Sequence, residues 1–324
     1  MKAVRELLNE IATDNSTAAV EKYSYNGLSE EQKKELDAKG VEHYAGKVRE
    51  LVKDGDTLHI YHSDRLSAFD RYIGMVPFKG AILADISKFW LEETEKLMPT
   101  HFKSMKHSRV IDGEACTPVM AEVIVRGYMA GSMARAYDKG VREFCGVTLP
   151  EGLTNYCKLP NAIITPTTKA AAFEHDEDAT PAELIESGVA TKEQWAQIEE
   201  MALKLFAHGQ KVYAEKGWIL VDTKYEFGFA KDGSIKVIDE VHTPDSSRLW
   251  DLASYEEKVS KGEAPVMLDK ENVRRYLLDQ GFKGEGDVPE VPAKVLVDLA
   301  KVYLGVAEKL SGKELMVEVE APSV

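Results

Sequence analysis

The sequence predicts a fold that mixes helices with antiparallel strand hairpins, and three segments carry this prediction. Residues 41–63 read as a hairpin around Asp54-Gly55, and residues 218–240 read as a second hairpin around Asp232-Gly233. Residues 191–216 instead place apolar side chains at helical spacing, which predicts a long helix. At 324 residues the chain is long enough to bury a full core, in one large domain or in two lobes.

The long helix has sequence signals at both ends. Thr191 and Gln194 form a capping box at its start, and Gly217 suits the position just past its end. Its apolar stripe is typical of core packing rather than of a cofactor site, and it comprises Trp195, Ile198, Met201, Leu205 and Val212.

The remaining elements follow from the same patterns. We expect a peripheral helical extension at residues 1–40, helices at 83–97, near 269–280 and near 292–310, a strand at 119–128, and a long polar loop at 159–181. The last dozen residues are expected to fray, as chain ends often do.

Composition and charge narrow the function classes. The net charge of −14 argues against a general nucleic-acid binder, and any anionic substrate must be held by local positive groups. Cys116, Cys145 and Cys157 lack metal-ligand spacing, which favours reduced thiols in a cytoplasmic protein. Neither a secretory signal nor a membrane span is recognisable. We therefore expect small-molecule substrates, no nucleic-acid or membrane partner, and a monomer or small homo-oligomer.

The second hairpin brings chemically active side chains together. With a two-residue turn at Asp232-Gly233, Glu226 lies directly opposite Asp239, with Cβ atoms about 4.5–5.5 Å apart. Two carboxylates this close repel each other unless a cation lies between them, and Mg²⁺ with nucleotide phosphates is a natural occupant. Strand alternation places Lys224 on the same face. The alternative is a half-buried hairpin with a solvated salt bridge, and a one-residue change of register would separate the two carboxylates.

A glycine and two cations lie near the start of the first hairpin. Gly46, Lys47 and Arg49 can cover a triphosphate, because glycine permits close backbone approach and the cations meet the charge. The segment is not a Walker A loop, since the Gly-Lys-Ser/Thr ending is missing. The alternative is a solvated strand face.

Three polar segments are further candidates. Residues 62–70 hold two acids, an arginine and two hydroxyls, or form only a capped turn. Arg126 ends a strand and Ser132 starts a short helix, where free N–H groups can bind phosphate or Ser132 can simply cap the helix. In the long polar loop, His175 is more consistent with a solvated, acid-paired histidine than with a metal ligand.

Six segments, in order and at matching spacing between about residues 41 and 251, resemble the SAICAR synthetase family of purine biosynthesis. They are GKVREL (46–51), SDRLSAFD (63–70), EVIVRGYMAGS (122–132), TPTTKAAAFEHDE (165–177), VDTKYEFG (221–228) and IDEVHTPDSSRLWD (238–251).

The resemblance implies an activity and a fold. It implies an ATP- and Mg²⁺-dependent ligase that joins L-aspartate to 5-amino-1-(5-phospho-D-ribosyl)imidazole-4-carboxylate (CAIR). It also implies a two-lobed α+β fold of antiparallel sheets with helices, related to protein kinases and ATP-grasp enzymes, with ATP between the lobes. The expected division is an extension at 1–40, an ATP-covering lobe at 41–118 and a C-terminal lobe at 119–324.

The resemblance also implies residue roles. Gly46, Lys47 and Arg49 would cover the ATP phosphates, Lys169 would belong to the same ATP site without an assigned contact, and Met120 to Glu122 would line the adenine pocket. Glu226 and Asp239 would carry Mg²⁺. Arg126, Ser132, Ser246 and Arg248 would hold the nucleotide substrate, while Asp64, Ser67 and Asp70 would place the amino acid. Lys224, Asp176 and Asp245 would act at the reacting groups.

Two features depart from the family pattern, and two rival functions remain open. Many members have lysine where this chain has Arg49, which contacts phosphate differently. Residues 1–40 and the tail beyond about residue 255 match no family motif. A kinase acting on a hydroxyl group would share the fold and the metal pair, and a non-catalytic nucleotide-binding module would bind ATP without turnover.

Overall fold

The structure is a computed structural model, and it describes residues 1–169 and 176–324. The chain divides into two compact units. The first comprises Met1–Glu92, His101–Ala115 and Asp269–Val324, and the second comprises Glu93–Thr100 and Cys116–Leu268. In the described part of the chain, every ladder between named strands is antiparallel, and no helix is both long and apolar enough to cross a membrane.

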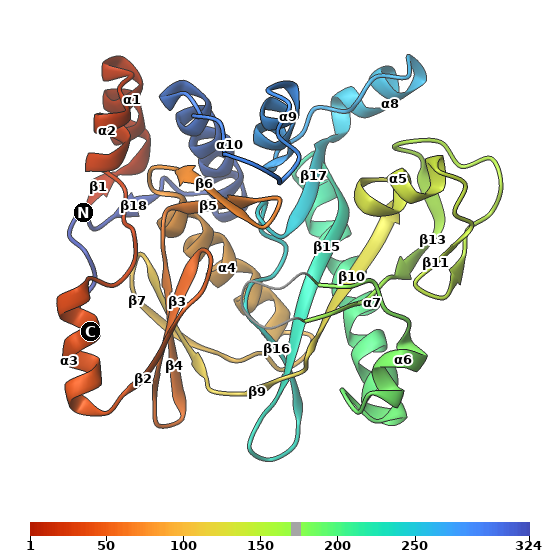
Figure 1. Ribbon diagram of the computed structural model, residues 1–324, viewed down its shortest axis with the longest axis horizontal. Coiled ribbons are helices and arrows are strands. Elements are labelled where there is room, and N and C mark those ends of the chain that lie inside the picture. Colours follow the sequence, from red (N-terminus) through yellow and green to blue (C-terminus); the bar gives the residue numbers. More distant parts are fainter. Residues whose placement is uncertain (170–175) are drawn as a thin grey trace. The chain divides into compact units, whose positions relative to one another are not determined.

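The first unit is built on a five-stranded sheet (Figure 1). Its strands, in spatial order, are β2 (Glu42–Ala45), β3 (Arg49–Asp54), β4 (Thr57–His62), β8 (Val110–Glu114) and β7 (Phe102–His107). Asp54 pairs with Thr57, so the predicted hairpin around Asp54-Gly55 is confirmed, and Gly55 takes the left-handed conformation that the tight turn requires. This unit also contains two separate antiparallel strand pairs: β5 (Arg65–Ala68) with β6 (Arg71–Met75), and β1 (Lys2–Ala3) with β18 (Met316–Val317).

Helices from both ends of the chain belong to this unit. They are α1 (Val4–Asp14), α2 (Thr17–Lys22), α3 (Glu30–Lys39), α9 (Glu271–Asp279), α10 (Ala293–Ser311) and most of α4 (Lys79–Glu95). The expected helices of the extension and of the tail are therefore present. Helix α1 lies beside α10 (Figure 1), and its apolar side packs in this unit.

The C-terminal residues do not fray, contrary to our expectation. Met316 pairs with Ala3 in the β1–β18 ladder. The Gln32 side chain donates a hydrogen bond to the Pro322 carbonyl at 2.8 Å, and the Tyr61 hydroxyl donates one to the Ser323 carbonyl at 3.0 Å. These contacts hold the tail in the first unit, whereas the expected division grouped it with the C-terminal lobe.

The second unit is built on a seven-stranded sheet whose main path is β13-β10-β15-β16. The strands are β9 (Thr117–Pro118), β10 (Ala121–Tyr128), β13 (Lys158–Ile164), β14 (Thr167–Thr168), β15 (Trp218–Phe229), β16 (Ile235–Ile238) and β17 (Ser247–Asp251). A separate pair joins β11 (Glu143–Phe144) to β12 (Val147–Thr148). The helices are α5 (Gly131–Asp138), α6 (Pro181–Glu186), α7 (Lys192–Glu215) and α8 (Leu252–Ser260).

Part of the predicted polar loop at 159–181 is a strand. Leu159 to Ile164 belong to β13, which pairs with β10 at the edge of the sheet. Pro160 concealed this strand, because proline cannot donate a ladder hydrogen bond and is tolerated only where none is needed, as on an edge strand.

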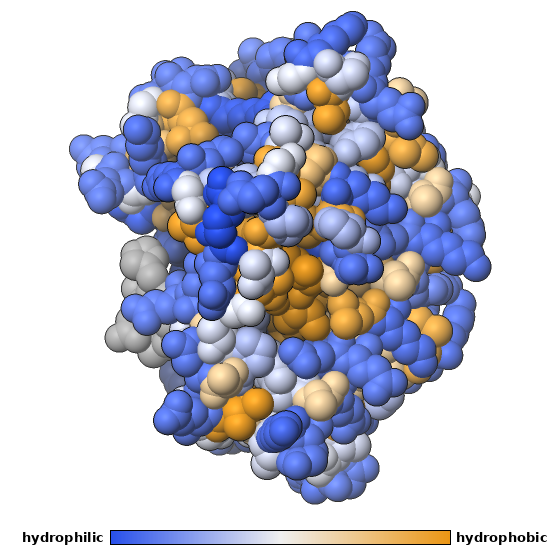
Figure 2. Space-filling view, turned by 90° about the vertical axis from the view of Figure 1, so that its right-hand side faces the viewer, coloured by the Kyte–Doolittle hydropathy of each residue, from blue (hydrophilic) through white to orange (hydrophobic). Residues whose placement is uncertain are grey.

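A small hydrophobic core supports α5 and the neighbouring strands. It comprises Met129, Met133, Ala134, Tyr137, Phe144, Leu149 and Leu159. Figure 2 views the side on which α5, α6 and β13 lie in Figure 1, and it shows hydrophobic residues gathered near the middle of this face, surrounded by hydrophilic ones.

The long helix α7 begins with the predicted capping box, in which Thr191 and Gln194 satisfy each other's backbone N–H groups. Its interior contains Gly209, which helices normally disfavour. The imidazole of His242 explains it, because a Cβ on Gly209 would lie 2.3 Å from a carbon of that ring. The ring is fully buried and bonds to the Tyr225 hydroxyl, while the Tyr213 hydroxyl donates to the His242 carbonyl at 2.5 Å.

Two glycine substitutions should therefore have opposite effects on stability. Gly305, inside α10, has open space where a Cβ would go. Gly305→Ala should raise the free energy of unfolding by roughly 0.5–1 kcal/mol through helix propensity. Gly209→Ala should lower it by roughly 1–3 kcal/mol, because the methyl group displaces His242.

Urea unfolding followed by tryptophan fluorescence measures both changes. A stabilising Gly209→Ala would show that contact with His242 is not the reason for this glycine.

Candidate functional site

The β15–β16 hairpin corrects the predicted carboxylate pair. Its loop has three residues rather than two, because the Ala230 and Ser234 backbones still pair, at 2.9 Å. Gly233 takes the left-handed conformation typical of such loops. Glu226 therefore faces Ile238 rather than Asp239, and the predicted cross-strand register is wrong by one residue.

Lys224 links Glu226 to a different carboxylate, that of Glu122. Its ammonium donates to Glu226 Oε1 at 2.6 Å and to Glu122 Oε1 at 2.8 Å. Burial lowers the pKa of Lys224, but the charges of Glu226, Glu122 and Asp239 outweigh this and raise it well above its usual value. Asp239 follows the last residue of β16 in a left-handed conformation, so strand alternation no longer decides where its side chain points.

Glu226 is almost fully buried and holds a second cation. Lys169 donates to its other oxygen, Oε2. Burial disfavours the charged form of Glu226, yet Lys224 and Lys169 together keep its pKa below the usual value. Burial raises the pKa of Glu122, and Lys224 opposes this, while Asp176 adds to the increase. The site is thus a chain of alternating charges: Lys169, Glu226, Lys224 and Glu122.

The donor chemistry of this site fits Mg²⁺. Glu226 and Asp239 supply carboxylate oxygens beside one lysine, and Mg²⁺ with nucleotide phosphates usually takes one or two protein carboxylates. Outside residues 170–175, the structure contains no group of three or more His, Cys, Asp or Glu side chains suited to a metal ion. The described residues therefore offer two carboxylates rather than an all-protein metal cage.

A row of charged residues crosses three neighbouring strands. The register pairs Arg126 of β10 with Asp222 of β15, and Asp222 with Arg248 of β17. Asp222 Oδ2 accepts hydrogen bonds from Arg248 at 2.9 Å and from Arg126 at 3.5 Å. Burial lowers the pKa of Arg126, and the charge of Asp222 opposes this. Sequence analysis missed Asp222 as a site residue, although its place two residues before Lys224 puts it on the same strand face.

Ser132 lies beside these arginines, but it does not cap the helix as one reading of the sequence had it. The N-cap of α5 is Ala130, and the Ser132 hydroxyl instead accepts a hydrogen bond from Arg126 at 3.1 Å. Gly131 lets the Arg248 guanidinium approach the helix start, because a Cβ there would lie 2.7 Å from its nitrogens. Arg126, Ser132 and Arg248 are therefore brought together, as expected.

Asp245 and Ser246 lie in a turn next to this row. The Thr243 hydroxyl accepts hydrogen bonds from the Asp245 and Ser246 N–H groups, both at 3.3 Å, and donates one to Glu240 at 2.6 Å. The Ser246 carbonyl accepts from the Lys224 N–H at 3.2 Å. The turn is thereby joined to β15.

Met120, at the predicted adenine-pocket segment, is half exposed, and its carbonyl accepts from the Lys169 N–H at 3.2 Å. Ala121 and Glu122 pair with β14. His175 lies outside the described residues, so its predicted pairing stays a prediction.

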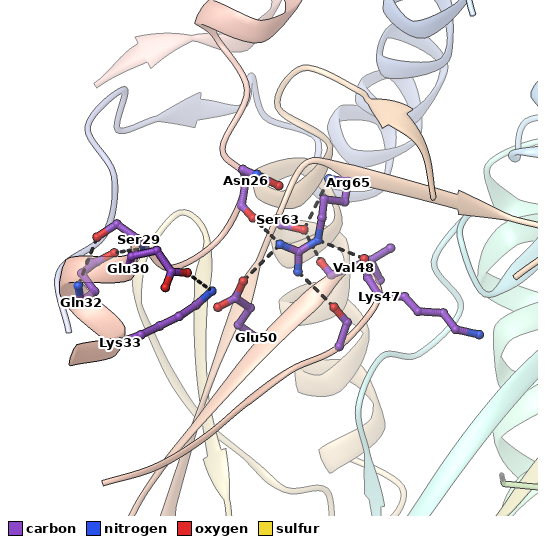
Figure 3. Close-up of polar contacts among 11 residues, drawn as sticks. Asn26, Ser29, Glu30, Gln32, Lys33, Lys47, Val48, Glu50, Ser63 and Arg65 are labelled. Atoms are coloured by element: carbon purple, nitrogen blue, oxygen red, sulfur yellow. Dashed lines mark hydrogen bonds and ion pairs between the residues drawn. The ribbon is translucent and has the colours of Figure 1, made fainter. Parts of the chain in front are cut away.

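The glycine segment of the first unit forms a turn rather than part of a strand. Gly46, Lys47 and Val48 connect β2 to β3, and the Gly46 N–H donates to the Arg49 carbonyl at 2.8 Å. Lys47 points away from this turn, as Figure 3 shows, and its ammonium lies 2.7 Å from an oxygen of Asp70. The predicted contact of this turn with a phosphate stays a prediction.

The three residues predicted to place the amino acid differ in exposure. Asp64 is fully buried and accepts 2.7 Å hydrogen bonds from the Tyr25 and Gly80 N–H groups and from Arg109. These contacts fit support of the segment better than contact with a substrate. Ser67 is partly buried in β5, and Asp70 lies in the exposed turn between β5 and β6.

The charge chain predicts a pH-dependent effect of Glu226→Gln. We expect the free energy of unfolding to fall by roughly 3 kcal/mol at pH 7, because Lys169 and Lys224 lose a charged partner. The pKa of Glu226 is lower in the folded protein than its ordinary value of 4.5. The extra stability of the wild-type protein over the variant is therefore complete above pH 4.5, and it is lost as the pH falls toward the pKa of the folded state. Below pH 4.5, the difference in free energy of unfolding between the wild-type protein and Glu226→Gln should shrink by about 1.4 kcal/mol per pH unit.

Urea unfolding of both proteins at pH 7 and pH 3.5 measures this change. An equal difference at the two pH values would contradict the charge pairing.

Comparisons with known proteins point to one family. The family model described as SAICAR synthetase matches residues 42–291. A phosphoribosylaminoimidazole-succinocarboxamide synthase of Bacteroides fragilis is 42% identical over 279 residues, covering 85% of this chain and 88% of that protein. The structure of SAICAR-synthase from Saccharomyces cerevisiae complexed with SAICAR is 30% identical with a TM-score of 0.74, covering 85% of this chain and 96% of that one. A type-2 SAICAR synthetase in complex with ADP is 28% identical with a TM-score of 0.65, covering 85% and 100%.

These matches confirm the resemblance carried by the six motifs. The matched region, residues 42–291, contains all of them. The mixed fold of helices and antiparallel sheets is also shared with the solved structures. The chain therefore belongs to the SAICAR synthetase family, whose members are ligases of purine biosynthesis.

Proposed function

We propose that this protein joins L-aspartate to CAIR with consumption of ATP, yielding SAICAR, ADP and phosphate. The observation that carries this proposal is the order of charges along β15. Asp222, Lys224 and Glu226 share one strand face, with the Arg126–Arg248 pair at one end and the carboxylate partners of Lys224 at the other. Four residues of strand span about 13 Å, the scale of a nucleotide.

Each end of this row suits a different part of the nucleotide substrate. Arg126, Ser132 and Arg248, assisted by Ser246, would hold the phosphate of CAIR, since guanidinium groups bind phosphate through paired hydrogen bonds. Lys224 would lie near the carboxylate of CAIR. Its raised pKa keeps it protonated at neutral pH, so it would act as a fixed positive charge rather than as an acid or base.

The residues that would contact ATP come from separate segments of the chain. Gly46, Lys47, Arg49 and Lys169 would contact its phosphates, and Met120 to Glu122 would line the adenine pocket. Glu226 and Asp239 would hold Mg²⁺, which supplies positive charge to the phosphates when it is bound. The segment from Asp64 to Asp70 would place aspartate, with Asp64 supporting it from inside.

The proposed chemistry proceeds through an acyl phosphate. A carboxylate oxygen of CAIR attacks the γ-phosphorus in line, and the bond from that phosphorus to ADP breaks. The neutral amine of aspartate then attacks the acyl carbon, the bond from this carbon to the phosphate oxygen breaks, and the amine loses a proton. Asp70 and Asp176 are candidates to receive that proton, whereas Asp64, also a candidate from the sequence, is fully buried. Catalysis of this kind depends mainly on positioning and electrostatic stabilisation.

The deciding experiment measures ADP release with CAIR, ATP and Mg²⁺, with and without L-aspartate. We expect ADP and SAICAR to form together only when aspartate is present. ADP release with CAIR alone would indicate an acyl phosphate that leaks to water. The absence of ADP in both reactions would refute the proposal and favour a kinase acting on another substrate.

The metal assignment predicts a loss of turnover. Glu226→Ala and Asp239→Ala should each lower kcat by at least about 100-fold, because the phosphates of ATP would lose their bound cation. Circular dichroism should show an intact fold. A near-normal kcat in either variant would remove that residue from the metal site.

The phosphate assignment predicts a selective change in KM. Arg248→Ala should raise the KM for CAIR by about 100-fold, while the KM for aspartate changes by less than about threefold. Steady-state kinetics with each substrate varied in turn measures this split. Equal increases in both KM values would argue against a contact between Arg248 and the CAIR phosphate.

A further inference from the structure

The glycine turn of the first unit is held by its carbonyl groups. Arg65 donates to the Gly46 carbonyl at 3.2 Å and to the Lys47 carbonyl at 3.0 Å. The Ser63 hydroxyl donates to the Val48 carbonyl at 2.6 Å (Figure 3). All three carbonyls of the turn are therefore bound by one short segment, which begins the SDRLSAFD motif.

The backbone N–H groups of this turn differ from its carbonyls, because only the Gly46 N–H is bonded within the described part of the chain. Within residues 1–169 and 176–324, neither the Lys47 N–H nor the Val48 N–H donates a hydrogen bond to the protein. Successive backbone N–H groups in a turn can form a concave binding site for an anion. By binding the carbonyls, Ser63 and Arg65 fix the peptide planes on which these two N–H groups depend.

Arg65 is itself fixed from two directions. Its guanidinium donates to Glu50 Oε1 at 3.1 Å, and Glu50 is almost fully buried. The same nitrogen donates to the carbonyl of Asn26. Asn26 belongs to the N-terminal extension, which precedes the family match at residues 42–291. The extension therefore contributes directly to the position of Arg65.

The extension fits this place only because of a glycine. Gly27 has a φ of 105°, which disfavours other residues. A Cβ on Gly27 would lie 2.3 Å from Glu50 Oε1 and 2.9 Å from Arg65 Nη1. Next to it, the Tyr25 N–H donates to the Asp64 carboxylate and the Tyr25 carbonyl accepts from the Asp64 N–H, both at 2.7 Å. Residues 25–27 are thus joined to the same segment that binds the glycine turn.

We propose that Arg65 is a positioning residue that holds the Gly46–Val48 turn in the conformation that binds nucleotide phosphates, and that residues 25–27 of the N-terminal extension are part of this support. The proposal deepens the proposed function and rests on it for the identity of the nucleotide. Arg65 acts through the turn rather than by touching the substrate.

The first test replaces Arg65 with lysine. Arg65→Lys keeps the charge, but one ammonium cannot reproduce the fixed fork that reaches Gly46, Lys47, Asn26 and Glu50. We expect the KM for ATP and the Kd for ADP to rise by about tenfold, while the KM values for CAIR and aspartate stay within about twofold. Arg5→Lys is the matched control, because among residues 1–169 and 176–324 the Arg5 guanidinium is bonded to Glu308 and to no group of the glycine turn.

Two results would overturn the role of Arg65. One is an unchanged Kd for ADP in Arg65→Lys, and the other is an equal rise in all three KM values. If Arg65→Lys fails to fold, Ser63→Ala replaces it, because this change removes the hydroxyl bond to the Val48 carbonyl and the 3.4 Å contact from the Arg65 N–H, and leaves the Arg65 side chain in place. It should raise the Kd for ADP by about threefold, and an unchanged Kd would refute the proposal.

The second test isolates the extension. Gly27→Ala should raise the Kd for ADP about as much as Arg65→Lys does, because its methyl group pushes Glu50 and Arg65 apart. Gly40→Ala is the matched control, since Gly40 also lies in the extension with a positive φ but has open space around a Cβ. Equal Kd values for the two variants would exclude a role for residues 25–27.

Isothermal titration with ADP separates this proposal from the proposed function. ADP binding does not require turnover, so the variants can be compared even if the wild-type protein shows no aspartate-dependent ADP release. That result would refute the ligase reaction alone. A wild-type protein that binds no ADP would refute both.

Discussion

The burial of charge along β15 is the constraint on which the second unit depends. Asp222 and Glu226 are both less than a tenth exposed, and an unpaired carboxylate at such depth costs several kcal/mol. Each is compensated by two cations: Asp222 by Arg126 and Arg248 of neighbouring strands, and Glu226 by Lys224 of the same strand and by Lys169. A change in the register of β10 or β17 would separate Asp222 from Arg126 or Arg248. The charge pattern thus specifies the strand pairing as well as the site.

After the last residue of β16, the positions of the side chains are determined by the backbone conformation of single residues rather than by strand pairing. Asp239 and His242 both adopt left-handed conformations, which are uncommon for residues other than glycine. The buried contacts of His242 with Tyr225 and Tyr213 hold this stretch in place, and Gly209 makes room for the imidazole. Strain of this kind persists only where surrounding packing determines it. Here the packed residue, His242, follows a candidate metal ligand, Asp239, by three positions in the chain.

Sequence reasoning succeeded where a local signal decides the outcome. The capping box at Thr191 and the hairpin around Gly55 depend on interactions within a few residues, and both are present. It failed at Asp232-Gly233, where Ala230 rather than Lys231 pairs with Ser234, so that the loop contains three residues. A dipeptide cannot distinguish these two turns, and the whole carboxylate-pair argument depended on that distinction.

The site residues could likewise be predicted only where a local signal in the sequence determines their position. Lys224 and Glu226 could be placed together, because alternation along one strand is local. Asp222 as the partner of two arginines could not, since its place depends on the pairing of three strands that are distant in sequence. Asp64 showed the opposite problem: its motif suggested a substrate contact, but only the tertiary structure reveals that Tyr25, Gly80 and Arg109 surround it.

Segments outside the family match contribute to the same unit as the glycine turn. The β1–β18 pair and the packing of α1 against α10 join the first and last residues of the chain, and Tyr25 joins the extension to Asp64. Because Asp64 and Arg65 are neighbours, the extension and the turn share one support. A chain lacking these contacts would need other groups to hold the Arg65 side chain. The family motifs therefore carry the chemistry, while part of their support lies in residues that no motif identifies.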